Sequence, residues 1–504
     1  MQIMESTSFQ KPPEGGGSSG IRLEVWAYCV WALLAAGLMV YAETLAYTGD
    51  ESFHMLAAQL IKAGKRPYLD FCFPQTPLNA YWNAFWMRMF GESWRTVHAV
   101  ASLETSGAVI LASQFVLKRF PERAWAVAAA IVTAVIIGTN GVVVEFGPLG
   151  QAYGMCLFTT VCAFRLTVAA VERRSGAWAT VAGAMSGAAA ASSMLSAPVV
   201  PVLLIWLVWK IGAGRWNKGL AFLAGCAVPF LPVLALFVES PRVVWFNVAE
   251  YHLYYRTLYW QQPLSHDLEV LTGWSVDSQS VLVGLLAISG IVFIVRRSNW
   301  DRALRSEFYL CAWLVLGISL ELAIGHPTFS RYFCLTVPFL AILVAAGLYA
   351  VGSRVFQPQR PFWPAFIVVF IVAGALARQI YDRVQDTYTW PQYQDIASKI
   401  QEITPANQEV FTNGSLYFLT KRRPLPGMEF EYSHKLNMEP AKMAALHVMP
   451  DPELKRLVAA GTFYSAATCS DSWVEDYELE KVYKNKATVH DCPVFWGPKA
   501  EKNF

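Results

Sequence analysis

The chain contains little charge for its length. Of its 504 residues, 15% are charged and 55% are hydrophobic, which makes it too apolar for an ordinary soluble enzyme of this size. The small net charge of +3 gives no reason to expect a nucleic-acid partner. Residues 1–20 do not resemble a cleaved export signal, because they are polar and end in a Gly- and Ser-rich run. Residues 1–24 are therefore expected to be a disordered tail.

The sequence also lacks cysteines at the spacing that is typical of metal sites. The nine cysteines form no such pattern, and most lie inside apolar segments, where they act as small hydrophobic residues. Cys469 and Cys492 are the exception, since they share a polar region and could pair there, stabilising a small domain by about 3 kcal/mol. The region after residue 382 has no nucleophile elbow and no phosphate-binding glycine loop. Supporting structure or acceptor binding is a better interpretation of that region than catalysis.

Long apolar segments dominate the rest of the chain, and the mean hydropathy is +0.34. A hydrocarbon core about 30 Å thick needs about 20 apolar residues per helix. The predicted fold is mainly α, a polytopic bundle of about eleven transmembrane helices within residues 25–381. The predicted spans are 25–46, 95–117, 124–142, 149–171, 176–193, 196–212, 218–238, 278–296, 307–325, 332–352 and 362–381.

Basic residues predict the orientation of this bundle. They gather in the loops near 118–123, 173–174, 210–218, 296–305 and 354–360, whereas the loops near 140–148 and 192–197 carry none. The positive-inside rule then places the N-terminus in the cytoplasm. The outer face receives the loops 47–94 and 239–277, the turn around His326, and residues 382–504, which are expected to form a small α/β or α+β domain.

The first outer loop, 47–94, predicts two helices. Residues 52–63 have apolar side chains at helical spacing, and a second helix begins at Pro77 with an aromatic stripe opposite Asn79 and Asn83. The second helix is too short to span a membrane, and its one-sided pattern suits a position in the headgroup plane. Packing against the bundle as ordinary core is a compatible alternative.

Asp50 and Glu51 stand directly after the first span. Two carboxylates at a membrane exit can take a proton from a hydroxyl or hold a cation beside a lipid-borne substrate. They can equally cap the helix that follows, because the first amides of a helix favour negative charge. Position alone leaves both interpretations open.

Other candidate residues lie in the later outer segments. Tyr255 and Arg256 belong to a cluster of polar aromatic residues that suits either a wet interfacial site or a membrane aromatic belt. The turn from His326 to Arg331 and Tyr332 brings one cation to the outer face. That arginine could serve a site or bind lipid phosphate.

The segment 49–71, GDESFHMLAAQLIKAGKRPYLDF, followed by an aromatic helix ending at Phe90-Gly91, resembles the first outer loop of GT-C membrane glycosyltransferases. The likeness is to the branch of protein O-mannosyltransferases and lipid A aminoarabinose transferases. The positions that match the motif of this branch are Asp50, Glu51, Gly64, Pro67, Tyr68 and Asp70. The segment from Arg331-Tyr332 to the helix at Pro338 is similar to the later half of the family.

The resemblance implies a reaction. A sugar would move from a polyprenyl-phosphate donor to a hydroxyl of a glycan, lipid or protein acceptor, with inversion, on the outer face of a bacterial cytoplasmic membrane. Asp50 would act as the general base, with Glu51 beside it. Arg331, together with Lys65, Arg66 or Arg256, would stabilise the leaving phosphate. Glu51 and Asp70 would position the acceptor or a cationic side chain.

The resemblance leaves a second acid undecided. Family members commonly carry one near the start of the fourth span, where this chain has Glu145 and Gln151. If Gln151 is the equivalent, the site has no second acid there, and we predict no obligatory metal or other cofactor. A transporter or flippase is the principal alternative function, although the spans contain few charges and no repeated half is visible. A non-enzymatic membrane anchor would leave the first loop without a purpose.

Overall fold

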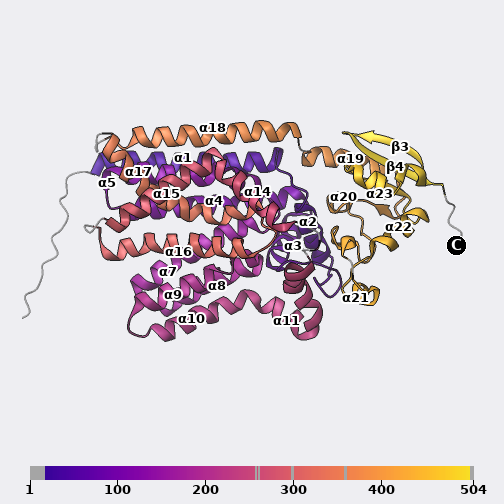
Figure 1. Cartoon of the computed structure of the whole chain (residues 1–504), viewed down its shortest axis with the longest axis horizontal. Coiled ribbons are helices and arrows are strands. Elements are labelled where there is room, and N and C mark those ends of the chain that lie inside the picture. The colour runs from indigo at the N-terminus through magenta and orange to yellow at the C-terminus, as the bar shows by residue number, and fades with distance from the viewer. Residues whose placement is uncertain are drawn as a thin grey trace, which may run out of the picture.

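The computed structural model describes residues 17–255, 258, 262–296, 300–356, 360–386, 388–436 and 438–499. Long helices lie along the longest axis of the molecule, and a small domain with a β-sheet lies at one end of this bundle (Figure 1). The N-terminal helix runs through the bundle, while the last strands lie at the far edge of the small domain. The chain is therefore an integral, multi-pass membrane protein with a separate C-terminal domain.

Nine helical stretches among the described residues are long and apolar enough to cross a membrane. Seven of the predicted spans correspond to α1 (Gly17–Thr44), α4 (Trp94–Arg119), α7 (Tyr153–Arg173), α9 (Val199–Ile211), α15 (Ser278–Arg296), α16 (Arg302–Ile324) and α18 (Phe362–Asp386). The other two stretches combine short helices with longer ones: α10 (Arg215–Ala227) with η2 (Val228–Phe230) and α11 (Leu231–Glu239), and η4 (Ser330–Thr336) with α17 (Val337–Val355). The stretch at α9 is also a combination, because α9 has only 13 residues and reaches a spanning length of 18 together with the short helix η1 (Met194–Ser196) before it.

The remaining two predicted spans are shorter helices. These are α5 (Arg123–Gly138) with 16 residues and α8 (Gly176–Ser192) with 17. At 1.5 Å per residue they reach about 25 Å, which is less than the hydrocarbon thickness of about 30 Å. Both pack against neighbouring helices of the bundle, so all eleven predicted segments are helical and nine have full spanning length.

Small residues allow the closest helix contacts. A Cβ atom added to Gly183 of α8 would lie 1.9 Å from the carbonyl oxygen of Phe222 in α10, and one on Gly347 of α17 would lie 1.9 Å from that of Leu286 in α15. Backbone therefore meets backbone at these crossings, as is common where membrane helices pack through small residues.

The first loop forms the two predicted helices, α2 (Glu51–Lys62) and α3 (Leu78–Phe90), where the bundle meets the small domain (Figure 1). In α3, Asn79 and Asn83 point inward and donate hydrogen bonds to the carbonyl oxygen of Gly150 at 3.0 and 2.8 Å. Phe85 and Met89 are exposed, so the apolar stripe faces outward, as the interfacial interpretation predicts. Helix α2 is instead buried along most of its length and contacts α20 (Gly414–Thr420) of the small domain.

The segment expected to be the loop 239–277 is largely helical. It contains α12 (Pro241–Trp245), a π-helix, η3 (Phe246–Tyr255), and α14 (Pro263–Val276). A short helix, α6 (Gly141–Phe146), also precedes α7.

The C-terminal domain is α+β in character. Its four-stranded sheet has the order β1 (Val410–Phe411), β2 (Ser465–Ala467), β4 (Cys492–Pro498), β3 (Tyr483–Val489), with β1 and β2 parallel and the other pairs antiparallel. Besides α20, its helices are α19 (Trp390–Ile403), η5 (Ser433–Lys435), α21 (Pro440–Ala445), α22 (Asp451–Ala459), α23 (Asp471–Asp476) and α24 (Leu479–Val482). Cys469 and Cys492 form the disulfide that their shared polar region predicted.

Candidate functional site

Asp50 occupies the N-cap position of α2, but its side chain makes no capping hydrogen bond. One carboxylate oxygen pairs with Arg331 Nη2 at 2.6 Å, and the other accepts a hydrogen bond from the hydroxyl of Tyr432 at 2.9 Å. The side chain of Asp50 is 24% exposed. A carboxylate from the first loop, a cation from the late bundle and a phenol from the C-terminal domain therefore meet at one partly open place.

Arg331 is held in position by aromatic rings. It stands at the start of η4, with its guanidinium 4.3 Å from the ring centre of Phe329 and 5.7 Å from that of Tyr332. Tyr332 is buried, and stacking on rings leaves the guanidinium hydrogens free to reach an anion. Arg331 is thus suited to bind a phosphate as well as a carboxylate.

Glu51 faces the other way and is completely buried. Its Oε1 lies 2.7 Å from His98 Nε2 and accepts a hydrogen bond from the backbone N–H of Gly150 at 2.5 Å, while Oε2 accepts one from Trp390 Nε1 at 3.3 Å. These contacts join α2 to α4, to the α6–α7 connection and to α19. Glu51 therefore holds the N-terminus of α2, and with it Asp50, in place.

Sequence reasoning missed one acidic residue and one phenolic residue of the C-terminal domain, Glu431 and Tyr432. Glu431 accepts hydrogen bonds from Ser52 Oγ at 3.1 Å and from the backbone N–H of Gly414 at 3.3 Å. Burial, aided by the negative charge of Asp50, raises the pKa of Glu431 to about 7. No sequence signal pointed to this residue, because it lies 381 positions after Asp50 in an irregular segment.

His54 was also missed. One turn after Asp50 in α2, it is buried and stacks against Phe53 with ring centres 4.3 Å apart. Burial lowers its pKa to about 4, and the charges of Asp50 and Arg331 act on it in opposite directions. Its Nδ1 atom is buried without a hydrogen-bond partner, so a neutral imidazole with unused hydrogen-bonding capacity lies near the carboxylate.

No family model matches the chain. Solved structures do. This chain superimposes on ArnT from Cupriavidus metallidurans in the apo state with a TM-score of 0.64 at 14% identity. The match covers 95% of this chain and 99% of the ArnT chain. ArnT bound to undecaprenyl phosphate gives a TM-score of 0.60 at 14% identity, with the same coverage. The oligosaccharyltransferase AglB from Archaeoglobus fulgidus, in complex with an inhibitory peptide and a dolichol-phosphate, gives 0.50 at 14% identity over 92% of this chain and 73% of that one.

The chain has the GT-C fold. The resemblance drawn from the first loop is therefore confirmed at the level of fold. The identities of about one residue in seven mean that the likeness speaks for architecture, so the chemistry of this chain has to be argued from its own side chains.

The turn that matches the motif of the GT-C loop has mainly structural contacts here. Tyr68 is buried, has a φ of 70°, and donates a hydrogen bond to the carbonyl oxygen of Gln75 at 2.6 Å. Asp70 accepts a hydrogen bond from the backbone N–H of Arg66 at 2.7 Å, and Arg66 pairs with Glu239 at 2.8 Å. Lys65 is exposed, and its charge acts on Glu429. In the described part of the chain these contacts lead away from Asp50.

Glu145, the candidate second acid of the GT-C site, pairs with Arg383 at 2.5 Å. Arg383 also donates a hydrogen bond to the carbonyl oxygen of Tyr47 at 2.6 Å. Gln151, the other residue considered for that position, donates to Thr48 Oγ1 at 2.6 Å. Both therefore support the chain just before Asp50, and the structure shows neither in contact with the Asp50 carboxylate.

Two candidates lie in separate clusters. The hydroxyl of Tyr255 accepts a hydrogen bond from Lys442 Nζ at 2.9 Å, and Lys442 pairs with Glu250 at 2.8 Å, which connects η3 to the C-terminal domain. His326 pairs with Asp267 of α14. Arg256 lies outside the described residues.

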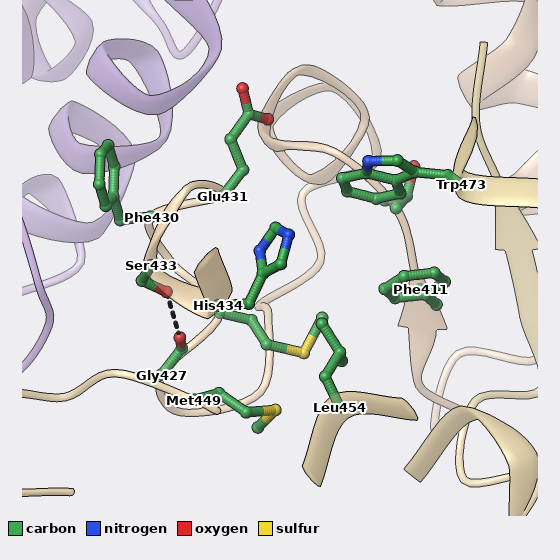
Figure 2. Close-up of a pocket in the computed structure, with 11 residues that line it drawn as sticks. Phe411, Gly427, Phe430, Glu431, Ser433, His434, Met449, Leu454 and Trp473 are labelled. Carbon is green, nitrogen blue, oxygen red and sulfur yellow. Dashed lines mark hydrogen bonds between the residues drawn. The ribbon is translucent and has the colours of Figure 1, made fainter. Parts of the chain in front are cut away.

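A small pocket lies inside the C-terminal domain beside Glu431 (Figure 2). Its volume is about 20 Å³, and its lining includes Phe411, Trp473, His434 and Met449. In Figure 2 the ring of His434 points into the pocket, whereas Glu431 extends from the same segment on the side away from Met449. Glu431 thus lies between this domain's interior and α2. Among the described residues, no group of three or more His, Cys, Asp or Glu side chains could hold a metal ion.

Proposed function

We propose that this protein is an inverting glycosyltransferase that moves a sugar from a polyprenyl-phosphate donor to an acceptor hydroxyl. The reaction would take place on the outer face of a bacterial cytoplasmic membrane, with the N-terminus in the cytoplasm and the C-terminal domain outside. The observation that carries the proposal is the 2.6 Å pair between Asp50 and Arg331, at the end of a GT-C bundle where α2 meets the C-terminal domain.

The pair supplies the two groups that such a transfer needs. A carboxylate can take the proton from the attacking hydroxyl, which typically contributes a factor of about 10² to 10⁴ in rate. A guanidinium can bind the phosphate and stabilise its growing negative charge as it leaves. Aromatic support on Arg331 and burial of its surroundings strengthen that interaction, because fewer waters screen it.

The pair also suggests an order of binding. While Arg331 is bound to Asp50, the carboxylate is engaged and the cation is neutralised. A donor phosphate that takes over Arg331 would release Asp50 to face the acceptor hydroxyl. Donor binding would therefore create the active base, and acceptor binding would follow.

The similar structures support the donor class. The structures of ArnT and of the archaeal oligosaccharyltransferase hold undecaprenyl phosphate and dolichol-phosphate, and both ligands are polyprenyl phosphates. In this chain, Arg331 is the phosphate ligand that we assign. Glu51 is assigned a positioning role through its contacts to His98 and Gly150, and the predicted roles of Lys65, Arg66 and Asp70 in substrate binding remain predictions.

Mass spectrometry of lipid that co-purifies with the full-length protein tests the proposal. We expect a polyprenyl phosphate or its sugar conjugate in the wild type and in Asp50→Asn, and its loss in Arg331→Met. Asp50→Asn should retain the lipid yet abolish sugar transfer at unchanged protein level. Substrate flux into sealed vesicles without covalent change would instead show a transporter, and turnover by Asp50→Asn would remove Asp50 as the base.

A further inference from the structure

Glu431 lies beside the start of α2 although it belongs to the C-terminal domain. Ser52, two residues after Asp50, donates a hydrogen bond to Glu431 Oε1 at 3.1 Å, and the backbone N–H of Gly414 donates one to Oε2 at 3.3 Å. The charge of Asp50 acts directly on Glu431. Two carboxylates from opposite ends of the chain are therefore held next to each other.

The hydroxyl of Tyr432 connects the two carboxylates. It donates a hydrogen bond to Asp50 Oδ1 at 2.9 Å, and hydrogen bonding from the same hydroxyl lowers the pKa of Glu431, so its single proton can serve either carboxylate. A phenol has one proton to donate and lone pairs to accept another. It can therefore take a proton on one side and release its own on the other.

The surroundings of the two carboxylates differ. Asp50 is partly open and pairs with Arg331, whereas burial raises the pKa of Glu431 to about 7. A group with this pKa holds a proton more readily than an ordinary carboxylate does and still releases it near neutral pH. The titratable or charged described groups near Glu431 or the bridging phenol are Asp50, Arg331, Tyr47, Tyr393, Lys435, whose Nζ lies 5.5 Å from the ring centre of Tyr432, and His434, which contacts the backbone of Glu431.

We propose that Glu431 receives, through Tyr432, the proton that Asp50 removes from the acceptor hydroxyl. The inference rests on the transferase function proposed above. The acceptor oxygen loses its proton to Asp50 and bonds to the anomeric carbon, while the bond from that carbon to the phosphate oxygen breaks and the polyprenyl phosphate leaves with the electron pair. Once Asp50 is protonated, the hydroxyl of Tyr432 turns from it toward Glu431, and Asp50 donates the proton to the phenol oxygen as the phenol proton moves to Glu431. Asp50 is then charged again, and Glu431, which is partly exposed, releases its proton to water before the next turnover.

An infrared pH titration of the full-length protein tests the coupling without any substrate. We expect a protonated carboxyl band that disappears as the pH rises through about 7, is missing in Glu431→Gln, and titrates at lower pH in Asp50→Asn because a negative neighbour is gone. Glu429→Gln is the matched control, since Glu429 is in the same segment and burial also raises its pKa to about 7. It should remove a different band and leave the response to Asp50→Asn intact. The inference would be overturned if the band that titrates near pH 7 persisted in Glu431→Gln, or if its titration did not move to lower pH in Asp50→Asn.

The pH profile of turnover tests the proton transfer itself. Release of polyprenyl phosphate is measured with the donor lipid that co-purifies with the wild type, with water as acceptor. Glu431→Gln should lower the rate at least about tenfold and remove the rise in rate through pH 7, and Tyr432→Phe should do the same. Binding of undecaprenyl phosphate should stay unchanged in both, which shows that they are folded. Glu429→Gln should keep the wild-type rate and profile.

Failure of this inference can be distinguished from failure of the proposed transferase function. If Glu431→Gln keeps the wild-type rate and pH profile while Asp50→Asn is inactive, this inference is wrong and the transferase function stands. If the wild type carries no polyprenyl lipid and releases no polyprenyl phosphate, the proposed function is wrong, and the inference with it.

Discussion

At the scale of single residues, the central feature is that the proposed base and the proposed phosphate ligand are each other's partners. Asp50 and Arg331 are each 24% exposed, so their interaction is screened less than a surface ion pair and is worth more than the usual 0–1 kcal/mol of such pairs. A phosphate that binds Arg331 has to replace this partner. The affinity for the phosphate is therefore set by a competition within the protein.

Removing the competitor should strengthen phosphate binding. We expect Asp50→Asn to bind undecaprenyl phosphate about tenfold more tightly than the wild type, because Arg331 is released and a like charge is removed. Equilibrium binding to the purified protein measures this. Asp70→Asn is the control, since Asp70 interacts with Arg66 and its loss should change the affinity little. Equal or weaker binding by Asp50→Asn would contradict the competition.

A second residue-scale prediction concerns stability. Burial raises the pKa of Glu429 to about 7 from an ordinary value of 4.5. The folded protein then binds more protons than the unfolded chain between these values, so stability falls as the pH rises from 4.5 to 7, by on the order of 3 kcal/mol. Glu429→Gln should narrow the difference in Tm between pH 5 and pH 8. Glu453→Gln should not, because Arg456 lowers the pKa of the exposed Glu453 and that group stays charged over this range.

At the scale of elements, the α8–α10 and α15–α17 pairs approach closely enough at glycines for backbone to contact backbone. The crossing of α8 and α10 places Gly183 against the carbonyl of Phe222, and α8 also packs on α7, which carries Tyr153 close to Arg331. A change in this crossing would therefore be transmitted toward the site through packed helices.

Alanine substitutions can test this contact. Gly183→Ala should destabilise the protein by about 1–3 kcal/mol, because the new methyl group meets a backbone oxygen that cannot move independently. Gly37→Ala is the matched control in α1, where nothing lies within 4 Å and alanine favours the helix by about 1 kcal/mol. Tm measurements in detergent should thus shift in opposite directions. A similar Tm for both variants would show that the α8–α10 crossing tolerates separation.

At the scale of the whole molecule, the site is assembled from three parts of the chain that the GT-C fold brings together. The first loop could be predicted from sequence, because helix periodicity, a proline start and a motif are all local signals, and both α2 and α3 form where these signals place them. The spans were predictable for the same reason, although α5 and α8 are shorter than a full crossing.

The partners of Asp50 could not be predicted in the same way. Arg331 was a candidate because a cation in a short outer turn is unusual, but Glu431 and Tyr432 lie in an irregular segment whose position depends on how the C-terminal domain docks on α2. Glu51 is adjacent to Asp50 in sequence and yet points into the protein, since consecutive residues at a helix start face different directions. Sequence proximity suggested that both carboxylates face one site, whereas the structure places Asp50 at a partly open position and Glu51 in the interior.

The composition of the site also leads to a prediction about whether the reaction needs a metal ion. In the proposed reaction Arg331 supplies a positive charge for the phosphate, and no group of three or more metal-ligating side chains occurs in the ranges that the structure describes. We therefore expect the transfer rate to be unchanged after treatment with a chelator, with Arg331→Met as the variant that does lose activity. Loss of activity on chelation, restored by one divalent cation, would show that a metal takes part.

The position of Tyr432 in the chain has a consequence for biosynthesis. The ribosome makes Asp50, the proposed base, before its phenol partner Tyr432, which follows 382 residues later. A nascent chain or a product truncated before this point can insert its helices, but Asp50 then lacks the domain that covers it. Complete synthesis and docking of the last domain thus act as a checkpoint, so that unfinished copies in the membrane would consume no donor lipid.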